Sequence, residues 1–595
     1  MVDSNKKKYL YLKKIKFLIM NEKIDMVSLP KKSFWQLSVP IIAFCIFDAI
    51  YGIVDLAWIS QISVHASFAV SVSIPFVSLI FSFGDSIGQG ANSLMSRFIG
   101  INDYESAYNA LIHGIILTNI IWIFIVICTL FAQGILYSVD QADSYLLVWD
   151  YLIPIIAFAY IFMFVNFFSE TLQAEGNSRI PTIFIISSNI LNIILDPIFI
   201  FNLNLGVKGA AYATVLSSLI PFIVFIFLYL SKKTKIPLSK KYFKFRPYIL
   251  IEIFKVALPN FLDDGLWAFS ASFINGILLV TMGDIGPVLY SASNKLKTLL
   301  SSPIKGYGRA LMSVTGHLFG AHEFDELNEM YKYALKVSLI TTVVVMIAFI
   351  ILRDYAFSFF SITGMQTEVY WIAILGTVIM ISIPFSIISS KMLDGFGKSM
   401  YSLLFTCIKI CLETCFIYLL NNMLSNGSCV LIGITITEII FAIVYYVFLR
   451  YLFKNFDKKY ENKEVVKTFN SDNETETLKE YAKIKDDGAK KNKTLKKILL
   501  NIALIAMIIG VILIVLSPIS VNDYSIFIGG IICLAICTVS IYLITRLNRP
   551  IISLLGFVVS ALILFTFMHS YGNKSILWFI VAEILIVLIT IILKR

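Results

Sequence analysis

The stretch Pro40 to Trp58 reads PIIAFCIFDAIYGIVDLAW, an apolar run interrupted by two acids and a phenol. Asp48, Tyr51 and Asp55 follow the spacing i, i+3, i+7, which places them on one stripe of an α-helix about 10 Å long. An Asp at the centre of a membrane-spanning helix costs on the order of 3 kcal/mol, so such residues usually face a cavity and serve transport or proton relay. The alternative, stronger for Asp55 than for Asp48, is a carboxylate that snorkels at a membrane edge.

The composition extends this interpretation to the whole chain. Hydrophobic residues make up 58% of the 595 residues, charged residues only 15%, and the mean hydropathy is +0.83. These values lie far outside the range of soluble globular proteins and predict a polytopic membrane protein. The net charge of +11 comes from basic residues between apolar spans, which positive-inside topology explains better than nucleic-acid binding.

Apolar segments long enough to cross a bilayer divide the chain into sets. Six lie between residues 36 and 230, six between 249 and 452, and four between 498 and 593. The distribution of Lys and Arg favours both termini on the cytoplasmic side of the cell membrane. The predicted organisation is a basic cytoplasmic N-terminus (1–34), a first six-helix lobe (35–231), a cytoplasmic inter-lobe loop (232–248), a second six-helix lobe (249–453), a charged cytoplasmic linker (454–497) and a four-helix membrane module whose role the sequence does not indicate (498–595).

The two six-span sets resemble each other. Pro40 corresponds to Pro259, the Gly88-Gln89-Gly90 run to Gly306-Tyr307-Gly308, and Gly100 to Gly320, all at offsets near 220 residues. Because each set has an even number of spans, both copies should have the same orientation and be related by a pseudo-two-fold axis along the membrane normal. The predicted fold class is therefore an all-α polytopic membrane protein with two six-helix lobes and four extra C-terminal helices. Coincidental placement of Gly and Pro is the alternative.

A second polar stripe lies in the fifth predicted span. Asn189, Asn192 and Asp196 repeat the i, i+3, i+7 spacing, and both acid-bearing spans run in the same direction, so Asp55 and Asp196 fall in the outer half. Thr214 on the antiparallel sixth span reaches a similar depth. Carboxylate, amide and hydroxyl oxygens at one depth could hold Na⁺ or share a proton, while a structural polar network is the alternative.

Several motifs resemble one family. The runs LQAEGNSRIP (172–181), NIILDP (192–197) and GVKGAA (206–211), with Gly52-Ile53-Val54-Asp55 and the Gly100 turn, look like the prokaryotic multidrug and toxic compound extrusion (MATE) transporters over residues 34–453. The resemblance implies two lobes forming a V, alternating access, and antiport of lipophilic, often cationic, compounds against Na⁺ or H⁺. It also implies a coupling-cation site at Tyr51, Asp55, Asn192, Asp196 and Thr214, with Na⁺ ligands from the last four.

Charged residues elsewhere depart from the family pattern or require partners. Asp48 replaces a common uncharged amide, and the Phe261-Leu262-Asp263-Asp264 run carries acids where an apolar residue followed by Gln is usual. The sequence predicts a possible substrate cavity lined by five residues, Asp48, Asn189, Asp263, Asp264 and Lys305. Whether Asp263 and Asp264 pair with Lys305 and Arg309 or face substrate stays open, as do the partners of Lys409, Glu413 and Glu438.

Secondary active multidrug efflux is the favoured function. The alternatives are a flippase for a lipid-linked sugar, which would favour a cavity rich in Arg and Lys, and a non-transporting membrane sensor or scaffold built around the last four spans. No Walker loop, His-rich metal motif or activated nucleophile is found, so no enzyme activity and no cofactor beyond Na⁺ or H⁺ is expected. The expected partners are small substrates and the lipid bilayer, with a monomeric transport unit and association through the C-terminal module as an option.

Overall fold

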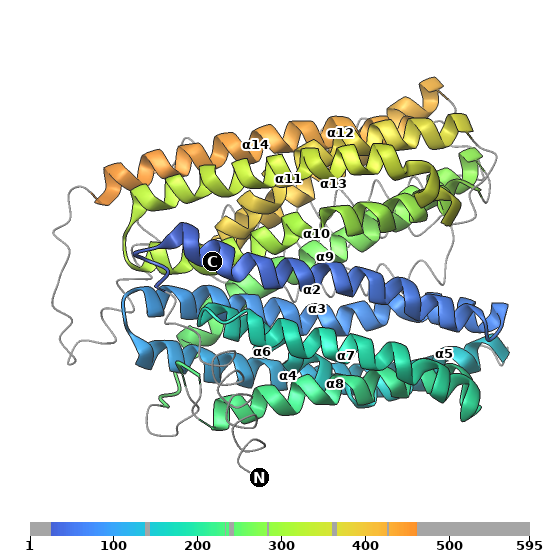
Figure 1. The fold of residues 1–595 in the computed structure, drawn as a ribbon, viewed down its shortest axis with the longest axis horizontal. Helices are drawn as coiled ribbons and strands as arrows, with labels where there is room; N and C mark the ends of the chain where they lie inside the picture. Colours follow the sequence, from blue (N-terminus) through green and yellow to red (C-terminus); the bar gives the residue numbers. More distant parts are fainter. Residues whose placement is uncertain are drawn as a thin grey trace, which may run out of the picture.

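The computed structural model describes residues 25–136, 143–231, 234–236, 243–282, 285–359, 366–424 and 428–460. In this part of the chain the regular secondary structure is helical, as Figure 1 shows. The four-helix module predicted for 498–595 lies outside the described residues, as do all but the first residues of the linker predicted for 454–497.

The helices between residues 30 and 230 form a group that we call the N-terminal bundle. Its members are α2 (Pro30–Ser60), α3 (Val64–Gly100), α4 (Tyr104–Leu136), α5 (Asp143–Ala157), α6 (Ala159–Ala174), α7 (Arg179–Pro197), the short π-helical turn η1 (Ile198–Asn202) and α8 (Gly206–Leu230).

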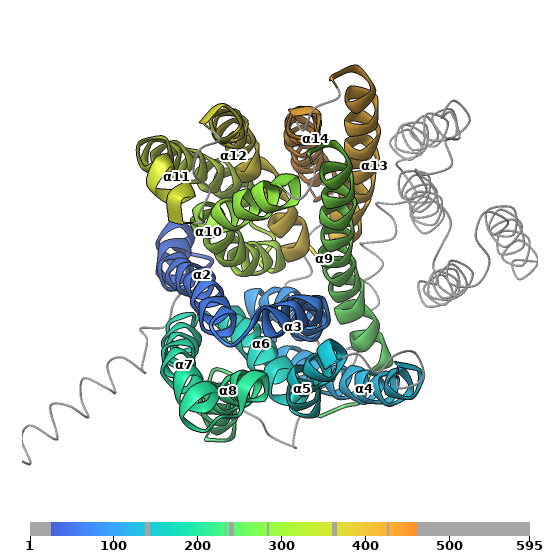
Figure 2. The same cartoon turned by 90° about the vertical axis from the view of Figure 1, so that its right-hand side faces the viewer.

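The helices between residues 247 and 460 form the C-terminal bundle. It contains α9 (Pro247–Met282), α10 (Ile285–Gly320), α11 (Phe324–Phe359), α12 (Gln366–Gly395), α13 (Ser399–Leu424) and α14 (Ser428–Tyr460). Viewed along the helices in Figure 2, α3 to α8 gather on one side and α10 to α14 on the other.

Each bundle begins with a helix that crosses into the other. The start of α2 places Phe34, Leu37 and Ile41 in the core of the C-terminal bundle, whereas its end places Ile59 in the core of the N-terminal bundle. In the same way, the start of α9 places Ile249 and Ile253 in the core of the N-terminal bundle. The two bundles therefore share their first helices.

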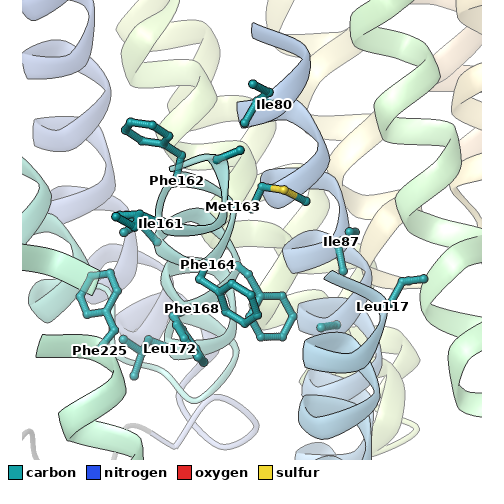
Figure 3. Packing of buried hydrophobic residues seen from close by; sticks show 14 of the residues in the cluster. Ile80, Ile87, Leu117, Ile161, Phe162, Met163, Phe164, Phe168, Leu172 and Phe225 are labelled. Carbon is teal, nitrogen blue, oxygen red and sulfur yellow. The ribbon is translucent and has the colours of Figure 1, made fainter. Parts of the chain in front are cut away.

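The core of the N-terminal bundle is built around α6. Figure 3 shows Phe162, Phe164 and Phe168 of this helix between α3, which carries Ile87, and α8, which carries Phe225. Aromatic rings bury a large apolar area each, so this cluster fixes the positions of the helices that carry polar residues.

The predicted fourth span is two helices rather than one. The helix axis bends by 53° between Leu147–Ala157 and Ala159–Ala174. Pro154, which has no backbone N–H to donate, lies one turn before the break and weakens the helix there.

Six helices in the described residues, or seven with the bent pair, are long and apolar enough to span a membrane by length and composition. Fewer helices pass than the twelve predicted spans of the two lobes. Two of the helices that do not meet this criterion are α9 and α10. Helix α9 carries Asp263 and Asp264, and helix α10 carries Lys305 and Arg309. These charges lower the hydropathy, and they line a cavity described below instead of facing lipid.

The bundles touch closely at the end where α3 and α10 terminate. A Cβ added to Gly320 would lie 2.1 Å from the carbonyl oxygen of Arg97, and one added to Gly100 would lie 2.3 Å from that of His317. Only glycine permits such an approach of two backbones. The two bundles are therefore in direct contact at this end, which the sequence predicts to be cytoplasmic.

Candidate functional site

A buried polar cluster joins α7 and α8 in the N-terminal bundle. Asn192 is 1% exposed and Asp196 0% exposed. The Nδ2 of Asn192 donates to Asp196 Oδ1 at 3.1 Å and, more weakly, to Thr214 Oγ1 at 3.5 Å. The hydroxyl of Thr214 donates in turn to the carbonyl oxygen of Ala210 at 3.0 Å.

The helix α2 contributes two further side chains to this cluster. Tyr51 hydrogen-bonds Thr214, and Asp55 lies close enough to Tyr51 and Asp196 to interact with both electrostatically. The structure therefore brings together the five residues predicted as a coupling-cation site. Tyr151 of α5, which sequence reasoning missed, is an electrostatic neighbour of both acids.

Two oxygen atoms of the cluster lack partners. Asn192 Oδ1 and Asp196 Oδ2 are buried and accept no hydrogen bond from a described residue. Buried polar atoms are normally satisfied, so two buried acceptors without partners, one of them a carboxylate oxygen, point to a proton or a hard cation. Among the described residues no group of three or more His, Cys, Asp or Glu could hold a metal, and the cluster instead combines two acids with amide and hydroxyl oxygens.

A cavity of about 570 Å³ lies mainly in the C-terminal bundle. Its wall contains acids and bases in equal number: Asp85, Asp263, Asp264, Glu413 and Glu438, with Lys297, Lys305, Arg309, Lys391 and Lys409. Three of the residues predicted for a substrate cavity, Asp263, Asp264 and Lys305, line it.

Asp48 and Asn189 are not among the lining residues, so the structure separates them from the other three. Asp48 is an electrostatic neighbour of Arg309 and Lys305, and Asn189 is on α7 with a buried amide nitrogen that has no partner. Although Asp48 is on the same helix as Asp55, the two acids have different surroundings.

Arg309 joins the two bundles by ion pairs that the sequence did not predict. Its guanidinium lies 3.0 Å from Asp85 of α3 and 3.4 Å from Glu170 of α6. Neither Asp263 nor Asp264 forms an ion pair with Arg309. Asp264 accepts a hydrogen bond from Ser82, and Asp263 Oδ1 is buried without a hydrogen-bond partner among the described residues. The pairing of Arg309 with these two aspartates, one of the two options from the sequence, is therefore absent from the described residues.

Lys305, one turn before Arg309, makes no ion pair with a described residue, although Asp48 and Asp264 lie near enough to interact with it electrostatically. Lys391 of α12 binds Asp394 Oδ2 at 2.9 Å, Gln89 Oε1 of α3 at 2.6 Å and Asn260 Oδ1 of α9 at 2.9 Å. Sequence reasoning missed Asp85 and Glu170; the signal for Asp85 was an acid in a predicted span, one helical turn before the Gly88-Gln89-Gly90 run.

The chain is similar in sequence to known membrane proteins. The family model MatE matches residues 40–198 and 268–419, which together make up just over half of it. The multidrug export protein MepA of Staphylococcus saprophyticus subsp. saprophyticus is 28% identical over 331 residues, covering 53% of this chain and 69% of that protein. MepA of Staphylococcus haemolyticus is 27% identical over 318 residues, with coverage of 53% and 69%.

Solved structures agree with these matches. The outward-facing conformation of a multidrug resistance MATE family transporter of the MOP superfamily has a TM-score of 0.70 at 26% identity, covering 74% of this chain and all (100%) of that one. A MOP superfamily transporter from Pyrococcus furiosus, described by a binding pocket of reverse polarity, has a TM-score of 0.70 at 26% identity, with coverage of 73% and 100%. The all-helical polytopic membrane fold predicted from the sequence is confirmed.

Proposed function

The chain belongs to the MatE family of multidrug efflux transporters, and on that premise we propose that it exports small lipophilic, often cationic, compounds in exchange for Na⁺ or H⁺. The observation that carries the proposal is the cluster of Asp55, Asn192, Asp196, Thr214 and Tyr51, in which the buried Asn192 and Asp196 each leave one acceptor without a partner among the described residues. A separate cavity lined by charges accompanies it. One site suits a coupling ion and the other suits an organic substrate.

Alternating access requires two bodies that move relative to one another. Repeated local geometry supports two six-helix lobes, the N-terminal and C-terminal bundles, related by a pseudo-two-fold axis. Asn102 after α3 has a φ of 61° and His322 after α10 a φ of 63°, and the family model matches two separate segments. The close contact at the Gly100 and Gly320 end supports an outward-open form, given the predicted topology.

Ion entry would bias this equilibrium by binding the two forms unequally. Protonation of Asp55 and Asp196, or Na⁺ held by Asp55, Asn192, Asp196 and Thr214, neutralises charge between α2, α7 and α8. A ligand can shift a conformational equilibrium only by its difference in affinity for the two forms. Closure of α2 around the ion supplies such a difference, because α2 also contacts the C-terminal bundle.

Substrate is proposed to bind in the cavity of the C-terminal bundle. Asp263 and Asp264 would attract a cationic group, Trp267 and Tyr290 supply apolar and aromatic surface, and Lys305 would restrict the charge that is accepted. The unit is proposed to act as a monomer in the cell membrane with both termini in the cytoplasm, and no cofactor is proposed beyond the coupling ion.

The flippase alternative draws on one observation, the five basic side chains of the cavity wall. A pyrophosphate group would need several of them free. Lys297, Arg309, Lys391 and Lys409 each have a carboxylate within 4 Å. The cavity therefore favours compounds of low charge over a lipid-linked pyrophosphate.

The test is export of a fluorescent cation from proteoliposomes under separately imposed Na⁺ and H⁺ gradients. Wild type is expected to respond to one of them, and Asp55→Asn to lose that response. Undiminished gradient-driven export by Asp55→Asn would remove the proposed site. Parallel measurement with a lipid-linked sugar tests the flippase alternative.

A further inference from the structure

Two buried glutamates and two lysines form a cluster on one wall of the cavity, and the proposed function leaves it unused. Lys409 Nζ of α13 lies 2.7 Å from Glu438 Oε1 of α14, and Lys297 Nζ of α10 lies 3.9 Å from the same atom. Glu413 Oε1, one turn from Lys409, accepts a hydrogen bond from Ser270 at 3.3 Å. Glu413 and Glu438 interact with each other electrostatically.

The position of Glu413 in its bundle corresponds to that of Asn192. The helices α7 and α13 both follow a glycine in the left-handed region, Gly176 with a φ of 90° and Gly397 with a φ of 68°. The turns are alike: Gly176 donates to Gln173 and Gly397 to Asp394, each at 2.9 Å. Asn192 follows Gly176 by the same number of residues as Glu413 follows Gly397.

The position of Glu438 corresponds to that of Thr214 by a second landmark. A Cβ on Gly209 of α8 would lie 2.6 Å from the backbone of Phe199, just after α7, and one on Gly433 of α14 would lie 2.7 Å from the side chain of Ile417 on α13. Both glycines thus let the last helix approach the one before it. Thr214 follows Gly209 by the same number of residues as Glu438 follows Gly433.

We propose that the C-terminal bundle carries its own cation: the ammonium group of Lys409 occupies the place that corresponds to the coupling-cation site of the N-terminal bundle. The inference rests on the proposed function, in which the cluster of the N-terminal bundle is the coupling-cation site. Where Asn192 and Thr214 offer neutral oxygens with unpartnered acceptors nearby, Glu413 and Glu438 offer carboxylates, and a covalently attached cation is within hydrogen-bond distance of one of them.

An attached cation cannot exchange with the solvent. The C-terminal bundle would therefore take up no monovalent cation during the cycle, and the gradient would act through the N-terminal bundle alone. A variant that lacks the ammonium group of Lys409 but keeps both carboxylates would have a negatively charged cavity of the size of a small ammonium ion. Free methylammonium can bind in that cavity.

Thermal unfolding of the detergent-solubilised full chain in choline, sodium and methylammonium chloride tests this. In an Asp55→Asn background, Lys409→Met is expected to lower Tm in choline chloride and to regain it with methylammonium, saturating as a bound ligand does. Asp55→Asn alone is expected not to respond. Lys297→Met in the same background is the matched control, because it removes the other lysine near Glu438 and leaves Lys409 in place.

A Lys409→Met variant that responds to methylammonium no more than the Lys297→Met control would overturn the proposal. A second comparison uses Lys409→Met combined with Glu438→Gln, which removes the cation together with its carboxylate. This pair is expected to fold without a methylammonium response, and a response equal to that of Lys409→Met would also overturn the proposal. Failure of the N-terminal site is read separately, from undiminished gradient-driven export by Asp55→Asn in the proteoliposome assay under either the Na⁺ or the H⁺ gradient.

Discussion

Arg309 of α10 reaches across the boundary between the bundles to Glu170 of α6, 3.4 Å away, and Glu170 is only 1% exposed. A buried carboxylate stays ionised when a cation and hydrogen bonds compensate it, and Asn92 Nδ2 also donates to Glu170 at 3.0 Å. The contact belongs to both bundles, so a conformational change that separates them at this level must break it.

Arg309→Met is expected to destabilise the protein strongly. The change leaves Asp85 and Glu170 without their cation, and breaking a buried pair in this way typically costs about 3–5 kcal/mol. The measurement is Tm in detergent. Lys31→Met is the control because its pair with Glu329 is exposed, with side-chain exposures of 51% and 61%, and exposed pairs contribute about 1 kcal/mol or less. Equal Tm values for both variants would contradict the assignment.

Asp196→Asn is expected to reduce ion-driven export strongly while preserving the fold. The amide keeps the size of the side chain and can still accept from Asn192, but it cannot be protonated or carry the charge that a cation requires. We expect at least about a tenfold loss of gradient-dependent export, the equivalent of ~1.4 kcal/mol. The control is Asp150→Asn on α5, whose partner is Lys208 at 3.0 Å, and it should export normally.

Gly320→Ala is expected to weaken the contact between α3 and α10. The new methyl carbon would lie 2.1 Å from the carbonyl oxygen of Arg97, so the helices must separate, and such overpacking typically costs about 1–3 kcal/mol. The readout is again Tm. Gly265→Ala provides the comparison because its Cβ would meet nothing within 4 Å, and the better helix propensity of Ala should leave stability unchanged or raise it. A Gly320→Ala variant as stable as Gly265→Ala would show that the helices do not touch there.

Asp264→Asn is expected to change which compounds are exported. The residue lines the cavity, so loss of its charge should reduce export of a cationic dye about tenfold relative to a neutral analogue of similar shape, as for loss of one ionic contact of ~1.5 kcal/mol. Ion-dependent cycling should remain. Glu329→Gln, on the exposed surface, is the control. Export kinetics that are unchanged for every compound would remove Asp264 from the substrate site.

Glu175→Gln is expected to flatten the pH dependence of stability. Glu175 lies in the turn between α6 and α7, 3% exposed, where its Oε2 accepts from the backbone N–H of Lys235 at 2.8 Å. Burial raises the pKa of this carboxyl from 4.5 to about 8. The folded form therefore binds the proton more tightly than the unfolded form, and wild type should lose stability as pH rises from about 4.5 to about 8.

The loss for wild type can reach roughly 5 kcal/mol, from ~1.4 kcal/mol for each pKa unit. The glutamine variant keeps an acceptor for Lys235 and has no proton to lose. A series of melts across this pH range should show a smaller decrease in Tm for Glu175→Gln than for wild type. Parallel curves would mean that Glu175 is ionised at neutral pH.

Helical periodicity and the resemblance to known transporters were enough to predict the helices and the cluster of the N-terminal bundle. Asn192 and Asp196 are one turn apart on α7, so their contact is local, and matching depth across antiparallel spans brought Thr214 to them. The role of this cluster as an ion site stays a prediction.

The separation of Asp48 from Asp55 could not be predicted in this way. Both lie on one stripe of α2, but this helix passes from the C-terminal bundle into the N-terminal bundle along its length. Asp55 accordingly interacts with Asp196, whereas Asp48 interacts with Lys305 and Arg309. The pairing of Lys409 with Glu438 in place of Glu413 likewise depends on how two helices pack, which no spacing within one helix records.

The exchange of first helices also constrains biosynthesis. The ring of Phe34 stacks on that of Tyr307 at 5.7 Å between centroids, so one half of this core contact leaves the ribosome long before the other. When only the N-terminal bundle has been inserted, the residues of the C-terminal bundle that pack against Phe34, Leu37 and Ile41 are not yet in place. The first helix therefore completes its packing only after α10 has been inserted, and the two bundles cannot mature one after the other as independent domains do.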